Sequence, residues 1–347
     1  MTTDRTRRAK TGRATIVDVA RLSGVSKSTV ANVINGTAPI ANHTRDRVLA
    51  AIEELGYRPN ALARDLKRRR TTTVGVLVGD LANPFYAELT KLIERRCSLA
   101  GYATIIAHTD GDRETERERL GVLLEQRVSG IVLLYFTGAR EHVEAVGRDG
   151  VPIVGVSVFD RGFDCVASDD AAGTRLAADH LAALGHERIA YVPGVGTESS
   201  TNRARQRGWR QALRAAGLTP GPVVGLDASV AGRGVTTLDA VLADAEQPTA
   251  YVAGNDLTAL DMIDRLEAEG VRVPRDASVV GFDDIPPARL GRLSLTTVRQ
   301  PIHGLATHGV ERLLARMDPQ AGPDAGPAVQ RRLPLELIVR GTTASPR

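Results

Sequence analysis

Hydrophobic positions near the N-terminus recur with the period of a helix in three short segments. The apolar faces that they predict are Ile16, Val19 and Ala20, then Val30 and Val33, and finally Val48, Leu49, Ile52 and Leu55. This spacing places the apolar side chains on one side of each helix, so that three helices can enclose a small shared core. We therefore expect a compact all-α unit at this end of the chain.

The residues between these segments favour helix ends and a tight turn. Thr15, Ser26 and Thr44 can each cap the N-terminus of a helix, because their hydroxyl groups accept hydrogen bonds from the first backbone amides. Gly24 lies between the first two helices, where a short turn often requires a positive φ. Two helices joined in this way are typical of the helix-turn-helix, whose second helix lies in the major groove of DNA. A three-helix protein-binding module has the same core spacing and remains the alternative at this point.

From residue 73 the pattern changes to short runs rich in Val and Ile, separated by helical stretches. The predicted strands are 73–80, 103–110, 130–136, 152–158, 188–194, 250–256 and 278–284, with helices such as 85–99 and 174–184 between them. Continuous apolar strands that alternate with helices are typical of parallel sheets covered on both faces. So many strands predict two Rossmann-like lobes in tandem, with a ligand at the carboxyl ends of the strands.

Charge separates the same two parts of the chain. Residues 1–73 contain 15 Lys and Arg against 6 Asp and Glu, whereas the remainder contains 30 against 35. A basic head on an acidic body fits a unit that binds a polyanion, joined to an independent second unit. A solvated basic tail is the alternative, because residues 5–13 carry a third of the positive charges of the head.

Other classes of protein lack support in the sequence. No apolar run approaches the roughly 18 to 20 residues that span a bilayer, and the basic N-terminus has no apolar segment behind it, as a secretory signal would. Cys97 and Cys165 stand in unrelated contexts, and the seven histidines are scattered. Walker A, HExxH and GxSxG motifs do not occur. We expect a cytoplasmic protein that is not an enzyme and needs neither metal nor cofactor.

Two stretches carry a specific resemblance. VDVARLSGVSKSTVANVING and TRDRVLAAIEELGYRPNALARDL resemble the head and hinge of the lactose-repressor (LacI/GalR) family, and the match is dense over residues 15–66. The hinge signature Gly-Tyr-x-Pro-Asn-x-x-Ala-Arg-x-Leu is intact at residues 56–66. One departure is Ala31-Asn32, where members of the family usually carry Ser-Arg. Losing that arginine removes a phosphate or base contact, which leaves the preferred operator sequence open.

The resemblance implies a set of DNA contacts in the head and hinge. These residues are Thr15, Ser26, Lys27, Ser28, Thr29, Asn32, Asn35, Tyr57, Asn60, Ala63 and Leu66. Lys27 can donate to guanine, and Asn32 can pair with adenine or reach a phosphate. In the family's arrangement Leu66 would enter the minor groove as an apolar wedge that kinks the duplex. The alternative is that Leu66 packs onto the body.

The remainder, over residues 73–343, resembles the periplasmic-binding-protein-like sensor of the same family, in stretches such as NPFYAEL, NDLTALDMI, GFDD and LTTVRQP. The resemblance implies a cleft that closes on a small effector. Phe85 would stack on an apolar face of the ligand, and Arg205 would donate to hydroxyl or carboxylate oxygens. Asn255 and Asp283 would bond to hydroxyl groups, and Asp110 is a weaker candidate. Structural roles remain as alternatives: Asp283 as a helix cap, Asn255 as a turn brace and Phe85 as core.

Ser157 stands where many relatives have an aspartate after the same strand, which weakens the assignment of a hexose as effector. The expected fold is an all-α helix-turn-helix head with a hinge helix, followed by an α/β two-lobed sensor with parallel sheets. The expected divisions are a basic tail at 1–14, the head at 15–58, the hinge helix and linker at 59–72, and an effector-binding and dimerisation domain at 73–343. Its first lobe would hold about 73–168 and 301–326, and its second lobe about 169–299 and 328–343.

These features predict a homodimeric transcription repressor, controlled by a small-molecule effector and bound to a pseudo-palindromic double-stranded operator, with no membrane partner. Two-fold symmetry of the protein would match two half-sites in the DNA, and effector closure would shift the hinge helices between ordered and disordered populations. No leucine heptad follows the sensor, so a coiled-coil tetramer is not expected. A periplasmic sugar receptor would need a signal peptide, and a sugar-converting enzyme would need a nucleophile, metal site or cofactor loop.

Overall fold

The computed structural model describes residues 14–35, 38–57, 71–194, 199–226, 235–318 and 328–347. The chain divides into two compact units, Met1–Thr71 and Thr72–Arg347. The expected hinge helix, with the candidate residues Asn60, Ala63 and Leu66, lies outside the described residues, and so does nearly all of the basic tail. Among the described residues, no helix is both long and apolar enough to cross a membrane.

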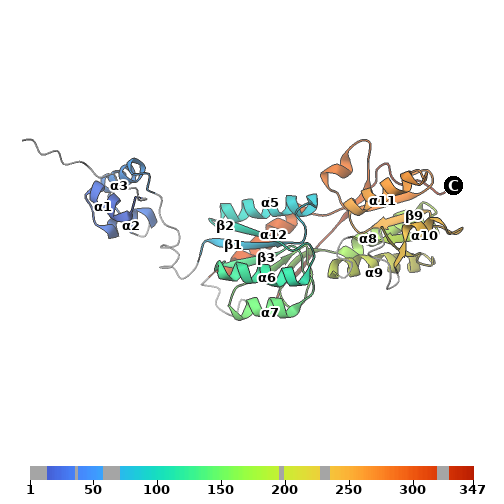
Figure 1. Ribbon diagram of the computed structural model, residues 1–347, viewed down its shortest axis with the longest axis horizontal. Coiled ribbons are helices and arrows are strands. Elements are labelled where there is room, and N and C mark those ends of the chain that lie inside the picture. Colours follow the sequence, from blue (N-terminus) through green and yellow to red (C-terminus); the bar gives the residue numbers. More distant parts are fainter. Residues whose placement is uncertain (1–13, 36–37, 58–70, 195–198, 227–234, 319–327) are drawn as a thin grey trace, which may run out of the picture. The chain divides into compact units, whose positions relative to one another are not determined.

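In its described residues the first unit contains three helices, α1 (Ile16–Ser23), α2 (Lys27–Asn35) and α3 (Asn42–Glu54), shown in blue in Figure 1. Their buried core consists of Val19, Ala20, Val30, Val33, Val48 and Ala51. The expected cap at Thr15 is confirmed as a capping box, in which the Asp18 carboxylate also accepts from the Thr15 amide at 3.0 Å. Gly24 has the expected positive φ, at 63°. Local hydrogen bonds and a small apolar core therefore define this unit.

Two predictions for the third helix were wrong. α3 begins at Asn42 and follows Ala41, which makes no side-chain cap, so Thr44 lies within the helix rather than before it. Leu49 is 50% exposed, and Ala51 takes the buried position instead. The reason is helical geometry: Ala51 is three residues from the buried Val48 and shares its face, whereas the side chain of Leu49 is turned by about 100° from it.

In the second unit, the first lobe is built on a six-stranded sheet in the order β12-β5-β4-β3-β1-β2. All neighbouring strands in it are parallel. Its strands are β1 (Thr73–Val78), β2 (Ala103–His108), β3 (Gly130–Leu133), β4 (Ile153–Val156), β5 (Asp164–Ser168) and β12 (Gln330–Leu333). Its helices are α5 (Pro84–Leu99), α6 (Arg113–Glu125), α7 (Arg140–Arg148) and α12 (Ile302–Met317), with α5 and α12 on one face and α6 and α7 on the other (Figure 1).

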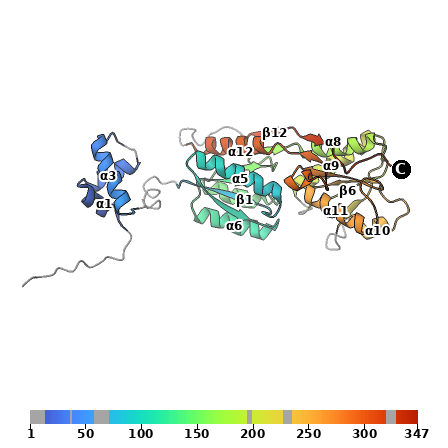
Figure 2. The ribbon, with the colours of Figure 1, turned by 90° about the horizontal axis from the view of Figure 1, so that it is seen from above.

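The second lobe is built on a seven-stranded sheet in the order β13-β11-β10-β9-β6-β7-β8. Among its described strands, β13 alone departs from the parallel arrangement, because it pairs antiparallel with β11. Its strands are β6 (Ile189–Val192), β7 (Val223–Gly225), β8 (Val235–Thr237), β9 (Ala250–Ala253), β10 (Ser278–Asp283), β11 (Thr296–Arg299) and β13 (Glu336–Ile338). The helices are α8 (Asp170–Ala183), α9 (Ser200–Ala215), α10 (Leu238–Leu242) and α11 (Asp256–Ala268), which Figure 2 shows from above, and a 3₁₀ turn, η2 (Pro286–Arg289), follows β10.

Alternating side chains of the second sheet supply two cores. Ile189 and Tyr191 pack with residues of α8 and α9, whereas Ala190 and Val192 belong to the cluster that includes residues of α10 and α11. Successive residues of a strand point to opposite faces, so these strands are apolar throughout. The prediction of parallel sheets covered by helices on both faces is confirmed.

The chain passes between the lobes at residues 168–170, 299–302 and 333–336, where neighbouring elements belong to different lobes. The sequence predicted that residues 328–343 belong to the second lobe, and this boundary was wrong for the third passage. β12 pairs with β5, from Gln330 opposite Cys165 to Leu333 opposite Ser168, so residues 330–333 belong to the first lobe rather than the second. This strand contains two exposed arginines, Arg331 and Arg332, and therefore lacks the apolar run that marks a buried strand.

Candidate functional site

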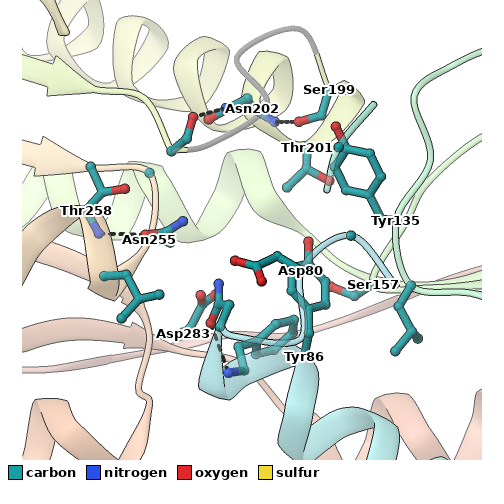
Figure 3. A pocket seen from close by; sticks show the side chains of 18 of the residues that line it. Asp80, Tyr86, Tyr135, Ser157, Ser199, Thr201, Asn202, Asn255, Thr258 and Asp283 are labelled. Carbon is teal, nitrogen blue, oxygen red and sulfur yellow. Dashed lines mark hydrogen bonds between the residues drawn. The ribbon is translucent and has the colours of Figure 1, made fainter. Parts of the chain in front are cut away.

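A cavity of about 290 Å³ lies between the two lobes, at the carboxyl ends of strands from both sheets. The first lobe contributes polar and aromatic groups that include Asp80, Asn83, Tyr86 and Tyr135, and the second contributes Asn202, Asn255 and Thr258, as Figure 3 shows in part. All five residues that the sequence suggested for the effector line this cavity: Phe85, Asp110, Arg205, Asn255 and Asp283. These five residues, which are separated by up to 198 positions in the chain, thus meet at one place, as expected for ligand sites of doubly wound folds.

Three lining residues have backbone angles that L-amino acids rarely adopt. The φ angles are 50° at Asp110, 64° at Ser157 and 126° at Asp283. Asp110 and Ser157 follow β2 and β4, and Asp283 ends β10, so each stands where a strand turns at the cavity. A positive φ at a residue other than glycine costs free energy and is concentrated at functional sites. The strain supports a binding role for this edge of the sheets.

Arg205 is held rigidly on α9 and is only 6% exposed. Its Nε donates to Asp170 Oδ1 at 2.8 Å, its Nη1 donates to the carbonyl oxygen of Gly254, and its Cζ lies 3.6 Å from the ring centroid of Phe282. Burial alone would lower the pKa of Arg205, but the charges of Asp170 and Asp283 outweigh burial and raise it. The guanidinium therefore stays charged, and its planar donors are fixed before a ligand arrives.

Asp283 is buried at the end of β10. Its Oδ1 accepts from Gln300 Nε2 at 2.7 Å and lies 3.8 Å from Arg205 Nη2. Burial, reinforced by the charge of Asp256, raises the pKa of Asp283 to about 8, although Arg205 opposes the shift. The carboxyl can therefore change protonation near neutral pH and can accept from a ligand hydroxyl or donate to one. The structure does not place Asp283 at a helix N-terminus, which removes the alternative that it is a cap.

The structural alternatives hold in part for two other candidates. Asn255 is the N-cap of α11, and its Oδ1 accepts from the Thr258 amide at 2.8 Å. Phe85 is only 5% exposed and belongs to a buried hydrophobic cluster, with its ring edge-on to Tyr86 at 5.3 Å. Both residues line the cavity and also support the fold. Asp110 is exposed, at 3.4 Å from His108 Nδ1.

Some lining residues were not among the site residues that the sequence suggested. Tyr86, Tyr135 and Asn202 are examples, and Figure 3 shows their side chains around the cavity. Tyr86 belongs to the stretch NPFYAEL, and Tyr135 stands at the end of a predicted strand. Their places in the chain were therefore the only features of the sequence that could have marked them as site residues. Burial also raises the pKa of the Tyr86 hydroxyl, which keeps it protonated and able to donate a hydrogen bond.

Two other polar residues at strand ends have structural roles. Asp256 is buried and accepts hydrogen bonds from the amide of Ile285 and the hydroxyl of Thr297. The buried side chain of Asp284 forms ion pairs with Arg289, Arg299 and Arg340. Neither residue lines the cavity. Sequence position alone does not separate such residues from Asp283, because a carboxylate that follows a strand can turn toward either the ligand or the loop.

In the first unit, the candidate DNA contacts gather at the start of α2. Ser26 Oγ accepts from the Thr29 amide at 3.0 Å and lies 2.7 Å from Ser28 Oγ, so Ser26 caps this helix. Lys27 and Ser28 are exposed. An exposed cation and hydroxyl in the first turn of the second helix are the groups that a helix-turn-helix presents to DNA. This end of α2 is the candidate nucleic-acid interface.

The remaining described candidates lie elsewhere in the head. Thr15 caps α1, Asn32 is half-buried within α2, and the half-buried Tyr57 packs against the core of the head. Asn35 is the last residue of α2, and nothing is described of its side chain. Within the residues that the structure describes, no group of three or more His, Cys, Asp or Glu side chains is arranged to hold a metal ion.

Residues 15–60 match the family described as bacterial regulatory proteins, lacI family, and residues 178–343 match a periplasmic binding protein-like domain. The HTH-type transcriptional repressor PurR of Photobacterium profundum is 36% identical over 311 residues, which cover 88% of this chain and 92% of that protein. The ribose operon repressor of Escherichia coli K12 is 36% identical over 309 residues, covering 88% and 93%. The transcriptional regulator DegA of Bacillus subtilis is 35% identical, covering 96% and 98%.

Solved structures agree with these relatives. The lac repressor dimer bound to operator and the anti-inducer ONPF superposes with a TM-score of 0.81 at 28% identity, covering 96% of this chain and all of that one. A LacI family regulator from Enterococcus faecium with bound ribose has a TM-score of 0.65 at 27% identity and covers 79% of this chain and all of that one. The similarity thus extends over both units of the chain.

Proposed function

Because this chain belongs to the LacI family of bacterial regulatory proteins, we propose that it represses transcription from operator DNA under the control of a small polyhydroxylated effector. As a member of that family it is a DNA-binding transcription regulator with a small-molecule effector. The proposal concerns the sense of regulation, the class of effector and the residues that bind it. The observation that carries it is the cavity between the lobes, lined by Arg205 and Asp283.

The chemistry of the lining supports a polyhydroxylated ligand. Asp80, Asp283 and Asn202 supply carboxylate and amide oxygens, while Arg205 and Tyr86 supply donors. Such a mixture of acceptors and donors matches hydroxyl groups, each of which can both donate and accept. The solved relative with bound ribose and the ribose operon repressor point to a pentose as the first compound to test.

The effector is tested by isothermal titration of full-length protein with D-ribose, other monosaccharides, nucleosides and sugar phosphates. We expect a neutral polyol to bind, and Arg205→Met and Asp283→Asn to weaken it. Arg207→Met is the matched control, because Arg207 is exposed on the same helix and does not line the cavity. Two outcomes would contradict the assignment of Arg205 to the effector site. One is an equal loss of effector affinity in Arg205→Met and Arg207→Met, and the other is unchanged affinity in Arg205→Met.

We propose that the start of α2 binds the operator and that Lys27 is the cation there that contacts the DNA. In this arrangement two copies of the chain bind two half-sites, as in the lac repressor dimer on its operator. We propose that the protein acts in the cytoplasm, where it has access to chromosomal DNA. After operator selection from genomic fragments, Lys27→Ala should weaken binding, whereas Lys91→Ala, an exposed lysine of α5 in the second unit, should not.

The two proposed activities reside in separate compact units, so they are separable. A fragment of residues 72–347 should lose operator binding yet keep the heat of effector binding. Light scattering should give a dimer for the full-length chain. Loss of both activities in the fragment would argue against independent units, and a monomer that binds the operator tightly would argue against the two-fold arrangement.

A further inference from the structure

Five buried polar side chains form one connected group where the lobes join. They are Ser168, Asp170, Arg205, Asp283 and Gln300, and their exposed fractions range from 3% to 8%. Buried polar groups are costly unless their hydrogen bonds are satisfied, and connected groups of this kind specify one arrangement of the elements that carry them. Their positions therefore bear on how the lobes are held.

Three hydrogen bonds and one ion pair join the group. Ser168 Oγ donates to Gln300 Oε1 at 2.7 Å, and Gln300 Nε2 donates to Asp283 Oδ1 at 2.7 Å. Arg205 Nη2 lies 3.8 Å from Asp283 Oδ1, and Arg205 Nε donates to Asp170 Oδ1 at 2.8 Å. Ser168 and Asp170 are two positions apart in the chain, so the backbone closes these contacts into a ring. We call these five side chains the crossover ring.

The crossover ring includes residues from two of the three passages between the lobes. Ser168 ends β5 of the first lobe and Asp170 begins α8 of the second, while Gln300 lies between β11 and α12. The third passage is adjacent, because the amide of Asp169 donates to the carbonyl oxygen of Leu333 at 3.3 Å. The lobes can rotate against each other only by changing backbone angles in these passages. A side-chain link between passages therefore restrains that rotation.

Two members of the ring line the cavity and three do not. Arg205 and Asp283 line it, whereas Ser168, Asp170 and Gln300 are not part of its lining. We propose that Gln300 and Ser168 are positioning residues, which hold the angle between the lobes and link it to the state of Asp283 in the cavity. The link to regulation rests on the proposed function, because it takes the cavity as the effector site. A ligand hydroxyl that donates to Asp283 shares the acceptor group that Gln300 uses, so occupancy of the cavity alters the link.

The angle between the lobes is measurable without a ligand. Spin labels on Glu144→Cys of α7 and Arg207→Cys of α9 place one label on each lobe of the full-length chain, at exposed positions. Cys97 and Cys165 are buried and should not take up label. An excess of unlabelled protein leaves a single labelled protomer in each expected dimer, and pulsed electron–electron double resonance then gives the distribution of distances between its lobes. We expect the parent protein to give a narrow distribution.

Both Gln300→Met and Ser168→Ala should broaden that distribution or shift its mean, because each removes the bond between the two passages. The double variant should resemble either single variant. Asp283→Ala should act in the same direction, and combining it with Gln300→Met should add nothing, because both residues belong to one link. Ser168→Ala is the milder change, and it keeps the test valid if Gln300→Met folds poorly.

The matched control is Ser278→Ala. Ser278 is buried, and its hydroxyl bonds to Ala344 and His186 inside the second lobe. We expect this variant to be less stable but to keep the parent distribution. Unchanged distributions in Gln300→Met and Ser168→Ala would overturn the proposal, and so would equal broadening in Ser278→Ala. No ligand is present in these distance measurements, so neither outcome bears on the effector assignment, which the isothermal titration tests separately.

Discussion

Gly208 lies where two helices of the second lobe are in close contact, and replacing it with alanine tests how that contact supports the cavity. Gly208 belongs to α9 and faces Ala171 of α8. A Cβ at Gly208 would lie 2.1 Å from the carbonyl oxygen of Ala171 and 2.8 Å from its carbonyl carbon. Both of these atoms are backbone, so no side chain can rotate away. The same two helices carry Arg205 and Asp170.

The magnitude follows from this overlap. A carbon and a carbonyl oxygen approach to about 3.3 Å at closest, so the helices must separate by roughly 1 Å. Overpacking of this kind costs about 1–3 kcal/mol, and backbone on the obstructing side favours the upper half of that range. Alanine regains about 1 kcal/mol of helix propensity relative to glycine. We expect Gly208→Ala to lower the free energy of unfolding by about 1–2 kcal/mol, or the Tm by about 2–8 °C.

The protein contains a convenient probe for this measurement. Trp209 is the single tryptophan of the chain, it is fully buried, and it follows Gly208 directly. Its fluorescence during thermal or urea unfolding reports the second lobe. Gly121→Ala is the matched control, because Gly121 lies within α6 and a Cβ there meets nothing within 4 Å. We expect Gly121→Ala to raise the stability by up to about 1 kcal/mol.

If Gly208→Ala were as stable as the parent protein or more so, the close approach of α8 and α9 would not be a constraint. The reasoning would also fail if both alanine variants moved in the same direction. A second readout is effector binding, which should weaken in Gly208→Ala because the separation of the helices disturbs the contact between Arg205 and Asp170. Gly121→Ala should leave it unchanged.

Three further predictions concern protons, a helix cap and salt. A bound polyol that donates to Asp283 favours its ionised form, so effector affinity should rise as the pH increases toward the pKa of about 8 and then level off, and Asp283→Asn should abolish this dependence. Folding raises the pKa of Asp283 from 3.8 to about 8, so this carboxyl should stabilise the folded protein less as the pH rises from about 4 to about 8. Urea unfolding of the parent protein and of Asp283→Asn at several pH values checks the direction of this change. Thr15→Ala should destabilise the head by about 0.5–2 kcal/mol in thermal unfolding by circular dichroism, since it removes the capping box, and no loss would contradict that role. Operator affinity measured by fluorescence anisotropy should fall steeply with salt, because lysine and arginine displace counterions, and a flat response would exclude phosphate contacts.

Much of the architecture was predictable from local patterns. The caps at Thr15 and Ser26, the turn at Gly24 and the apolar strands after residue 73 follow from interactions between neighbours in the chain, which a sequence displays directly. Weaker elements were missed for the same reason. β12 contains exposed arginines and exists because it pairs with β5, which lies more than 160 positions away in the chain.

The candidate site shows the same division. The sequence by itself indicated that Arg205 and Asp283 were ligand-binding candidates, both through the resemblance to a family and Asp283 also through its place at the end of a predicted strand. Only the tertiary structure separated Asp283, which lines the cavity, from Asp284, which is surrounded by three arginines. It also brought Gln300 against both Ser168 and Asp283. The direction of a side chain after a strand, and its neighbours from distant segments, depend on long-range packing, and no local pattern encodes them.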